Sequence, residues 1–156
     1  MTLADDQLSQ KAKATSFRLL KLRPRSTQEI RDRLLQKNYP AQVVEQVVSE
    51  LAAMGVLDDD AFAKAWVRWR LSGRPVGLRK LAQELRLKGI DKDTAGRYLA
   101  EAREEYDELV VVRVLAGDRV RFYKGLPLLK RRKRLFDYLL RRGFSVETIN
   151  KVIREL

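Results

Sequence analysis

The chain has 156 residues, enough for one ordinary domain or for an array of small units. It contains no cysteine and no histidine, which excludes a disulfide framework, a thiolate metal site and the commonest catalytic general base. We therefore expect no metal, no cofactor and no enzymatic activity. A hydrolase that uses carboxylates alone is the remaining enzymatic alternative.

Charge is the strongest compositional signal. The chain has 33 lysines and arginines against 21 aspartates and glutamates, a formal net charge of +12. This excess is larger than the roughly 2–8 charges that solubility alone calls for. It predicts a polyanionic partner, either nucleic acid or an acidic protein surface.

The composition also indicates the fold class and the compartment. Proline and glycine are scarce and β-branched runs are rare, which favours helices. The first residues lack the apolar core of a signal peptide, and no apolar run approaches the roughly 20 residues that cross a bilayer. We expect an all-α, cytoplasmic monomer with no membrane partner.

The first predicted unit covers residues 14–57 and follows a flexible N-terminus of residues 1–13. Its first helix spans 14–22, with Phe17, Leu20 and Leu19 as the candidate inward-facing side chains. Ser26 and Glu29 have the spacing of a capping box at the start of the second helix. A third helix over 41–54 carries a run of apolar residues on one side. Those residues are Val43, Val44, Val47, Val48 and Leu51.

The second predicted unit covers residues 58–103. Asp58 can cap its first helix, and this explains the Asp58-Asp59-Asp60 run better than a metal site does. Phe62, Trp66 and Trp69 recur at helical spacing, which predicts that their aromatic side chains face one side of the helix. The Ser72-Gly73-Arg74-Pro75 turn ends the helix.

The third predicted unit covers residues 104–156. The acidic stretch 101–108 leads into it, and one long helix that ends at Gly117 and Asp118 is the simplest reading. The stripe of Ile30 and Leu34 in the first unit recurs in the later units. It returns as Leu81 and Leu85, and again as Leu135 and Leu139.

One turn is repeated after these helices: a basic residue, a residue that tolerates positive φ, then a large apolar residue. The three copies are Lys37-Asn38-Tyr39, Lys88-Gly89-Ile90 and Arg142-Gly143-Phe144. The sequence thus predicts three tandem three-helix repeats stacked in an elongated, curved array.

Basic residues gather in the turn after the aromatic helix and in the third unit. Candidate contacts with a polyanion are Arg68, Arg70, Arg74, Arg79, Lys80, Lys88, Arg121, Lys124, Lys130, Arg131, Arg132, Lys133, Arg134, Arg141 and Arg142. The alternative is a solvated helix face whose long side chains cover the core. Phe122 and Tyr123 within this region are either stacking platforms for bases or core anchors.

Several stretches of the middle unit resemble the RecX family of bacterial RecA regulators. They are GVLDDDAFA (55–63), WVRWR (66–70), RPVGLRKL (74–81) and LRLKGI (85–90). The resemblance implies three three-helix repeats that bind the RecA–single-stranded DNA filament in its helical groove. It further implies inhibition of recombinase and ATPase activity, filament disassembly, and direct binding to DNA, both single-stranded and double-stranded. This would place the protein in homologous recombination, DNA repair and the SOS response.

A stand-alone helical DNA-binding protein of the helix-turn-helix kind is the rival hypothesis. Three-helix units with tight turns are compatible with it. No helix, however, combines the asparagine, glutamine and arginine side chains that read base edges.

Overall fold

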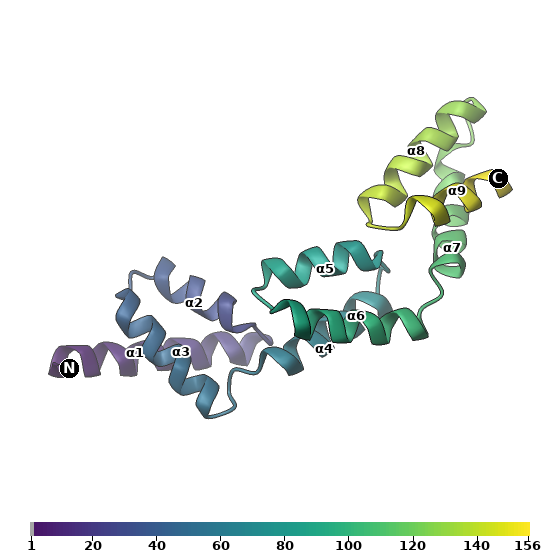
Figure 1. The fold of residues 1–156 in the computed structure, drawn as a ribbon. Coiled ribbons are helices and arrows are strands. Elements are labelled where there is room, and N and C mark those ends of the chain that lie inside the picture. Colours follow the sequence, from purple (N-terminus) through teal and green to yellow (C-terminus); the bar gives the residue numbers. More distant parts are fainter. Residues whose placement is uncertain (1) are drawn as a thin grey trace. The chain divides into compact units, whose positions relative to one another are not determined.

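The computed structural model describes residues 2–156, which form α-helices and one 3-10 turn with no strand in that range (Figure 1). The elements are α1 (Leu3–Leu22), α2 (Thr27–Gln36), α3 (Ala41–Ala53), α4 (Asp59–Ser72), α5 (Leu78–Leu87), α6 (Lys92–Glu105), α7 (Glu108–Val120), η1 (Arg121–Tyr123), α8 (Leu128–Arg141) and α9 (Val146–Glu155). The predicted all-α class is confirmed. None of the helices in residues 2–156 combines the length and apolarity needed to cross a membrane.

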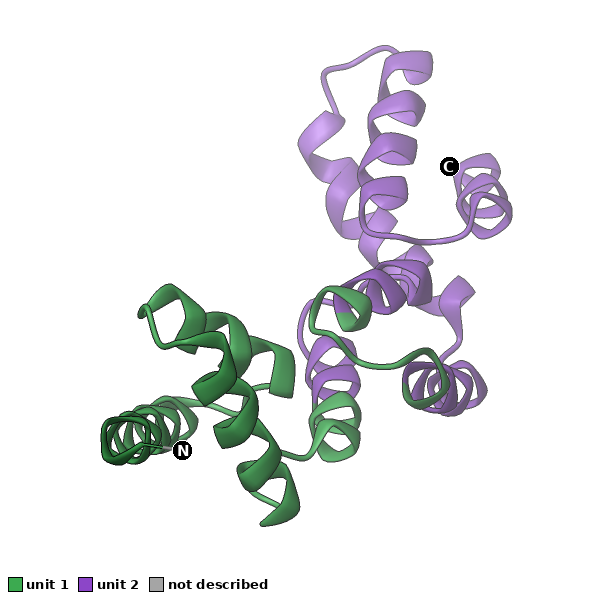
Figure 2. Ribbon diagram, turned by 60° about the vertical axis from the view of Figure 1, so that its left-hand side comes forward, with its two compact units in different colours: residues 1–65, 85–94 green, residues 66–84, 95–156 purple. Residues whose placement is uncertain are grey.

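Each predicted repeat has its three helices: α1–α3, α4–α6 and α7–α9. The chain divides into two compact units, unit 1 (residues 1–65 and 85–94) and unit 2 (residues 66–84 and 95–156) (Figure 2). The second repeat contributes to both units. The predicted curvature of the array and the repeat boundaries at 14–57, 58–103 and 104–156 stay predictions.

The core of unit 1 lies where α1 and α2 both pack against α3. All five apolar residues predicted for the inner side of α3 are buried, and Ile30 and Leu34 of α2 are fully enclosed. Ser26 and Glu29 form the predicted capping box, since the Ser26 hydroxyl accepts from the Glu29 amide and the Glu29 carboxylate accepts from the Ser26 amide. The second helix therefore starts where the sequence placed it.

The first helix differs from the prediction at its start. It begins at Leu3 instead of residue 14, because Thr2 and Asp5 form a capping box. The expected flexible N-terminus is thus helical from Leu3 onward, and Met1 lies outside the described residues. Of the three side chains predicted to face inward, Leu19 is buried and the half-buried Leu20 packs against the core, but Phe17 is 45% exposed, so its assignment was wrong. Small and polar side chains occupy the inward face with Leu19, namely Ser9, Ala12, Thr15 and Ser16.

In unit 2, α7, α8 and α9 pack against one another around Leu135, Leu139 and Phe144. The prediction of one long helix from the acidic stretch is wrong. The helix is interrupted between Glu105, the last residue of α6, and Glu108, the first residue of α7. There the Asp107 carboxylate accepts hydrogen bonds from two backbone amides and caps α7. The expected stop at Gly117 and Asp118 is also wrong, because α7 continues to Val120.

The repeated turn has the same backbone in all three copies. Asn38, Gly89 and Gly143 have φ of 66°, 73° and 84°. The following residue in each copy donates a backbone hydrogen bond to the carbonyl five positions earlier, which is the Schellman motif that ends a helix. These bonds are Tyr39 to Leu34 (3.2 Å), Ile90 to Leu85 (3.0 Å) and Phe144 to Leu139 (3.4 Å). The internal repetition in the sequence is therefore a repetition in backbone geometry.

The two glycine turns also pack closely against the repeat that precedes them. A Cβ on Gly89 would lie 2.5 Å from the Cβ of Gln28, in the first turn of α2. A Cβ on Gly143 would overlap the Cβ of Lys80, in the first turn of α5. Glycine is required twice over at both positions, for the positive φ and for the close approach.

Candidate functional site

The basic residues selected from the sequence fall into two groups, according to whether their side chains contact neighbouring groups of the protein. Lys88, Arg70 and Arg142 are held by neighbouring groups inside their own unit. Most of the others point into solvent. The exposed candidates are Arg68, Arg74, Arg79, Arg121, Lys124, Lys130, Lys133, Arg134 and Arg141, and the half-buried ones are Lys80, Arg131 and Arg132.

Lys88 forms an ion pair with Glu29 in unit 1. The same carboxylate accepts a 3.0 Å hydrogen bond from Arg23 and another from the Ser26 amide. Burial raises the pKa of Glu29, but the hydrogen bonds from Arg23 and Lys88 outweigh it, so the pKa is lowered overall. Lys88 therefore neutralises a half-buried carboxylate where the turn of the second repeat meets α2, and its ammonium is not free for a partner.

Arg70 has a comparable role in unit 2. Its guanidinium donates to both carboxylate oxygens of Glu84, at 3.0 and 2.8 Å, and the Trp66 indole donates to the same carboxylate at 3.0 Å. Glu84 thereby links α4 to α5. The predicted aromatic side of α4 is buried unevenly, since Phe62 is 6% exposed and Trp69 is 61% exposed.

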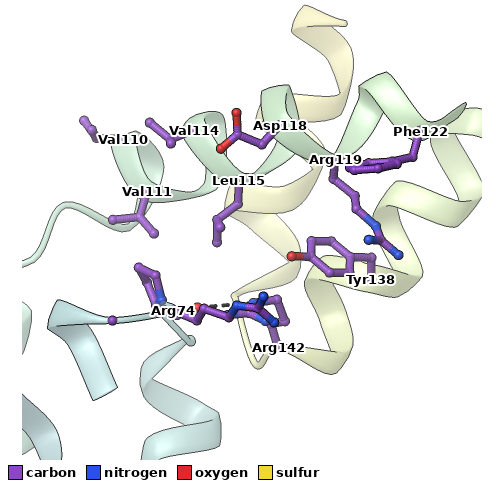
Figure 3. A pocket seen from close by; sticks show the side chains of 12 residues that line it. Arg74, Val110, Val111, Val114, Leu115, Asp118, Arg119, Phe122, Tyr138 and Arg142 are labelled. Atoms are coloured by element: carbon purple, nitrogen blue, oxygen red, sulfur yellow. Dashed lines mark hydrogen bonds between the residues drawn. The ribbon is translucent and has the colours of Figure 1, made fainter. Parts of the chain in front are cut away.

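Arg142 joins the third repeat to the segment before α5. It donates to the Pro75 carbonyl from Nε at 3.2 Å and from Nη2 at 2.6 Å, the bond drawn in Figure 3. The Gly77 amide donates back to the Arg142 carbonyl at 2.7 Å. Like Lys88, Arg142 is the basic residue just before the glycine of its turn, and both side chains reach back to the preceding repeat.

A cluster of basic residues lies at the start of α8. Lys130, Lys133 and Arg134 are exposed, and Arg131 donates to the Leu126 carbonyl at 3.3 Å. The first turn of α8 has no acidic residue, and its N-cap, Pro127, has no capping side chain. Cations near a helix N-terminus are unfavourable with the helix dipole. The cations at the start of α8 therefore do not stabilise this end of the helix.

A cavity of about 720 Å³ lies beside α7 in unit 2. We call it the α7 groove; its lining residues are Gly73, Arg74, Pro75, Val110, Val111, Val114, Leu115, Asp118, Arg119, Phe122, Tyr138 and Arg142. It brings together two of the sequence candidates, Arg74 and Arg142. Arg79 lines a different cavity, next to Arg103 and Glu108.

Arg119 is a functional candidate that the sequence analysis did not select. Its guanidinium carbon lies 4.8 Å from the ring centre of Tyr138 and 5.5 Å from that of Phe122, and its Nε donates to the Tyr123 hydroxyl at 3.1 Å. Tyr138 lies between Arg119 and Arg142 in Figure 3, and Arg142 is 5.7 Å from the same ring. The spacing of Arg119 and Tyr123, four residues apart in a helical stretch, was the signal that could have identified it.

The positions of the aromatic residues also settle the two interpretations of Phe122 and Tyr123. Tyr123 is 8% exposed and belongs to the core of unit 2, so it is a core anchor. Phe122 is 77% exposed, and the guanidinium of Arg119 lies 5.5 Å from the centre of its ring. Of the two, only Phe122 is available to a partner.

Comparison with known proteins gives matches along most of the chain. Family models for the first, second and third three-helix domains of RecX match residues 12–51, 58–99 and 105–153. Regulatory protein RecX of Thermobifida fusca is 35% identical over 152 residues, covering 97% of this chain and 82% of that protein. Regulatory protein RecX of Prosthecochloris aestuarii is 36% identical over 151 residues, covering 97% of each chain.

Two solved structures have the same fold. A crystal structure of regulatory protein RecX aligns with a TM-score of 0.81 at 23% identity and covers 98% of this chain and 74% of that chain. A crystal structure of RecX from Lactobacillus salivarius aligns with a TM-score of 0.75 at 20% identity and covers 97% of each chain.

Proposed function

The chain belongs to the RecX family, and on that premise we propose that it regulates RecA. It binds the RecA–single-stranded DNA filament in the helical groove, inhibits recombinase and ATPase activity, and promotes disassembly of the filament. Weak direct binding to DNA accompanies this activity. The protein is not an enzyme, and it acts as a monomer in the cytoplasm.

The observation that carries the proposal is the fold shared with RecX structures, together with exposed lysine and arginine side chains on more than one repeat. Arg68, Arg74 and Arg79 belong to the second repeat, and Lys130, Lys133 and Arg134 to the third. All six are exposed, and none of them forms an ion pair with an acidic side chain among residues 2–156. Cations without acidic partners are suited to phosphates or to acidic side chains of a filament.

Repetition explains how such contacts become effective. When linked units contact several filament subunits, each contact after the first is intramolecular, so several weak contacts together give a high overall affinity. If the protein binds more tightly to a filament geometry that does not support ATP turnover, binding shifts the filament population toward that inactive state. No nucleotide site or catalytic group is needed for this mechanism.

The direct test is a pull-down of the protein with RecA filaments on single-stranded DNA, combined with RecA ATPase assays. The proposal expects co-sedimentation and a lower ATPase rate. The matched variant reverses the charge of Arg68, Arg74 and Arg79 together and should weaken both effects. Absence of co-sedimentation with an unchanged rate would reject the proposal.

The rival function is stand-alone DNA binding, which the cation cluster at the start of α8 favours. Titration with salt separates the two. Sequence-blind binding with a log–log salt slope of roughly −0.7 to −0.9 per phosphate contact is what open cations alone give. Tight, sequence-selective binding to duplex without RecA would favour the rival.

A further inference from the structure

The α7 groove has an apolar side that the structure leaves uncovered. Val110 and Val114 are one helical turn apart, and they are 51% and 59% exposed. Val111 and Leu115 are the neighbouring pair on the same helix and are half-buried. In Figure 3 the side chains of Val111 and Leu115 point from α7 toward the segment that carries Arg74. Four aliphatic side chains from two turns thus form one continuous strip.

The groove also carries a fixed positive charge. Arg119 is held by aromatic rings and by the Tyr123 hydroxyl, and Arg142 is held by Tyr138 and the Pro75 carbonyl. Each guanidinium has five N–H donors, so these contacts leave donors for a further acceptor. Asp118 is the one acidic residue in the lining, and its carboxylate lies 3.8 Å from the guanidinium of Arg121.

We propose that the α7 groove binds an acidic, amphipathic segment of a partner protein. Apolar side chains of the segment cover the aliphatic strip on α7, in the manner of a helix in a groove. Carboxylates of the segment bind the guanidinium groups of Arg74, Arg119 and Arg142, since arginine and carboxylate form paired, charge-assisted hydrogen bonds. Preorganised arginines lose less conformational freedom on binding than free ones, which favours affinity.

A protein segment suits the groove better than nucleic acid does. Unpaired bases bind to flat aromatic rings beside cations, whereas valine and leucine offer no such ring. Phe122 is the one strongly exposed aromatic ring of the lining, and Arg119 already lies 5.5 Å from its centre. Four aliphatic side chains beside three arginines therefore favour a partner with both apolar groups and carboxylates.

The test measures fluorescence anisotropy of a labelled peptide with the full-length protein. The probe is a helix-forming peptide with leucines along one face and glutamates on the other. Two comparison peptides have the same residues in scrambled order, or lysines in place of the glutamates. We expect the amphipathic acidic peptide to bind at least about tenfold more tightly than either comparison.

Two variants locate the site. Val114→Glu places a carboxylate in the strip at a position already 59% exposed, so folding should be retained. It should weaken peptide binding by about tenfold or more. Leu129→Glu is the matched control, because Leu129 is 79% exposed on α8 and does not line the groove, and it should leave the affinity unchanged. Helical circular dichroism confirms that both variants fold.

The inference goes beyond the proposed function, which uses Arg74 of this groove as a filament contact but assigns no partner to the aliphatic strip on α7. A negative RecA assay leaves the peptide result unaffected. The inference is overturned if the amphipathic peptide binds no better than the scrambled one. It is equally overturned if Val114→Glu and Leu129→Glu change the affinity for the peptide to the same extent. A third outcome also overturns it: the parent chain does not bind the peptide but binds oligothymidine, and Val114→Glu abolishes the oligothymidine binding.

Discussion

The Gly77 amide donates a 2.7 Å hydrogen bond to the Arg142 carbonyl, and a Cβ on Gly77 would overlap the backbone of Gly143. Two backbone segments far apart in the sequence thus touch without a side chain between them. This contact sets the distance between the segment before α5 and the end of α8, and it lies beside the α7 groove.

Replacing Gly77 by alanine should therefore destabilise unit 2. We expect a loss of about 1–3 kcal/mol in the free energy of unfolding, because a well-packed contact must open to admit the methyl group. Chemical denaturation followed by circular dichroism measures it. Gly125→Ala is the control: its Cβ would meet no atom within 4 Å, so its stability should stay close to that of the parent chain. Equal effects of the two substitutions would contradict the close contact.

Gly55 and Gly89 provide a second matched pair, since both have φ of 73°. A Cβ on Gly55 would meet nothing within 4 Å, whereas a Cβ on Gly89 would lie 2.5 Å from the Gln28 Cβ. Gly55→Ala should cost about 1–2 kcal/mol for the left-handed backbone alone. Gly89→Ala should cost about 1–3 kcal/mol more from overpacking, again measured by denaturation. A larger loss for Gly55→Ala would show that the turn of the second repeat does not pack on α2.

Glu29 should make stability depend on pH in the acid range. Burial works against its carboxylate, but the hydrogen bonds from Arg23 and Lys88 lower its pKa in the folded state below the ordinary value of 4.5. A lowered folded pKa means that the stabilising contribution is present above the unfolded pKa and is lost as pH falls through the folded pKa.

The test of this pH dependence compares the parent chain with Glu29→Gln, which retains a capping side chain but removes the charge. The parent should be the more stable at neutral pH, and the difference should shrink once the pH falls below 4.5. Glu147→Gln is the control, because the Glu147 side chain is 80% exposed in its ion pair with Lys151. If the difference in unfolding free energy between the parent and Glu29→Gln does not vary with pH, the ion pairs of Glu29 with Arg23 and Lys88 do not stabilise the fold.

Lys130 lies in the first turn of α8, where a positive charge opposes the helix dipole. Lys130→Glu should raise the free energy of unfolding by about 0.3–1 kcal/mol. The same change should weaken binding to single-stranded DNA and reduce the salt slope, because it removes a cation. Lys124→Glu is the control for stability, as Lys124 is exposed outside the α-helices. A gain in stability with unchanged DNA binding would mean that this cluster is only solvated surface.

Local signals in the sequence were sufficient for much of the fold. Ser26 and Glu29 mark a helix start at short range, and Asn38, Gly89 and Gly143 mark the repeated helix end. The break before Glu108 was missed, because neither glycine nor proline marks it and its cap, Asp107, lies in an acidic run. The extension of α1 was missed because its inner face is built from small polar residues such as Ser9 and Ser16.

The candidate site was harder to predict for a physical reason. Charge alone does not distinguish a cation that binds a partner from one that neutralises a buried carboxylate or carbonyl. Lys88 neutralises the Glu29 carboxylate and Arg142 binds the Pro75 carbonyl. Both partners come from distant parts of the sequence, so the sequence does not reveal these contacts. Arg119 lines the α7 groove next to Tyr138, which lies on another helix, and the sequence alone does not show that these two side chains meet.

The most direct measurement is the rate of ATP hydrolysis by RecA on single-stranded DNA as the purified protein is added. Regulation through the filament predicts that the rate falls as the protein is titrated in, and that charge reversal at Arg68, Arg74 and Arg79 restores much of it. A rate that stays constant over the whole titration, with the protein folded and RecA active, would contradict regulation of RecA by this chain.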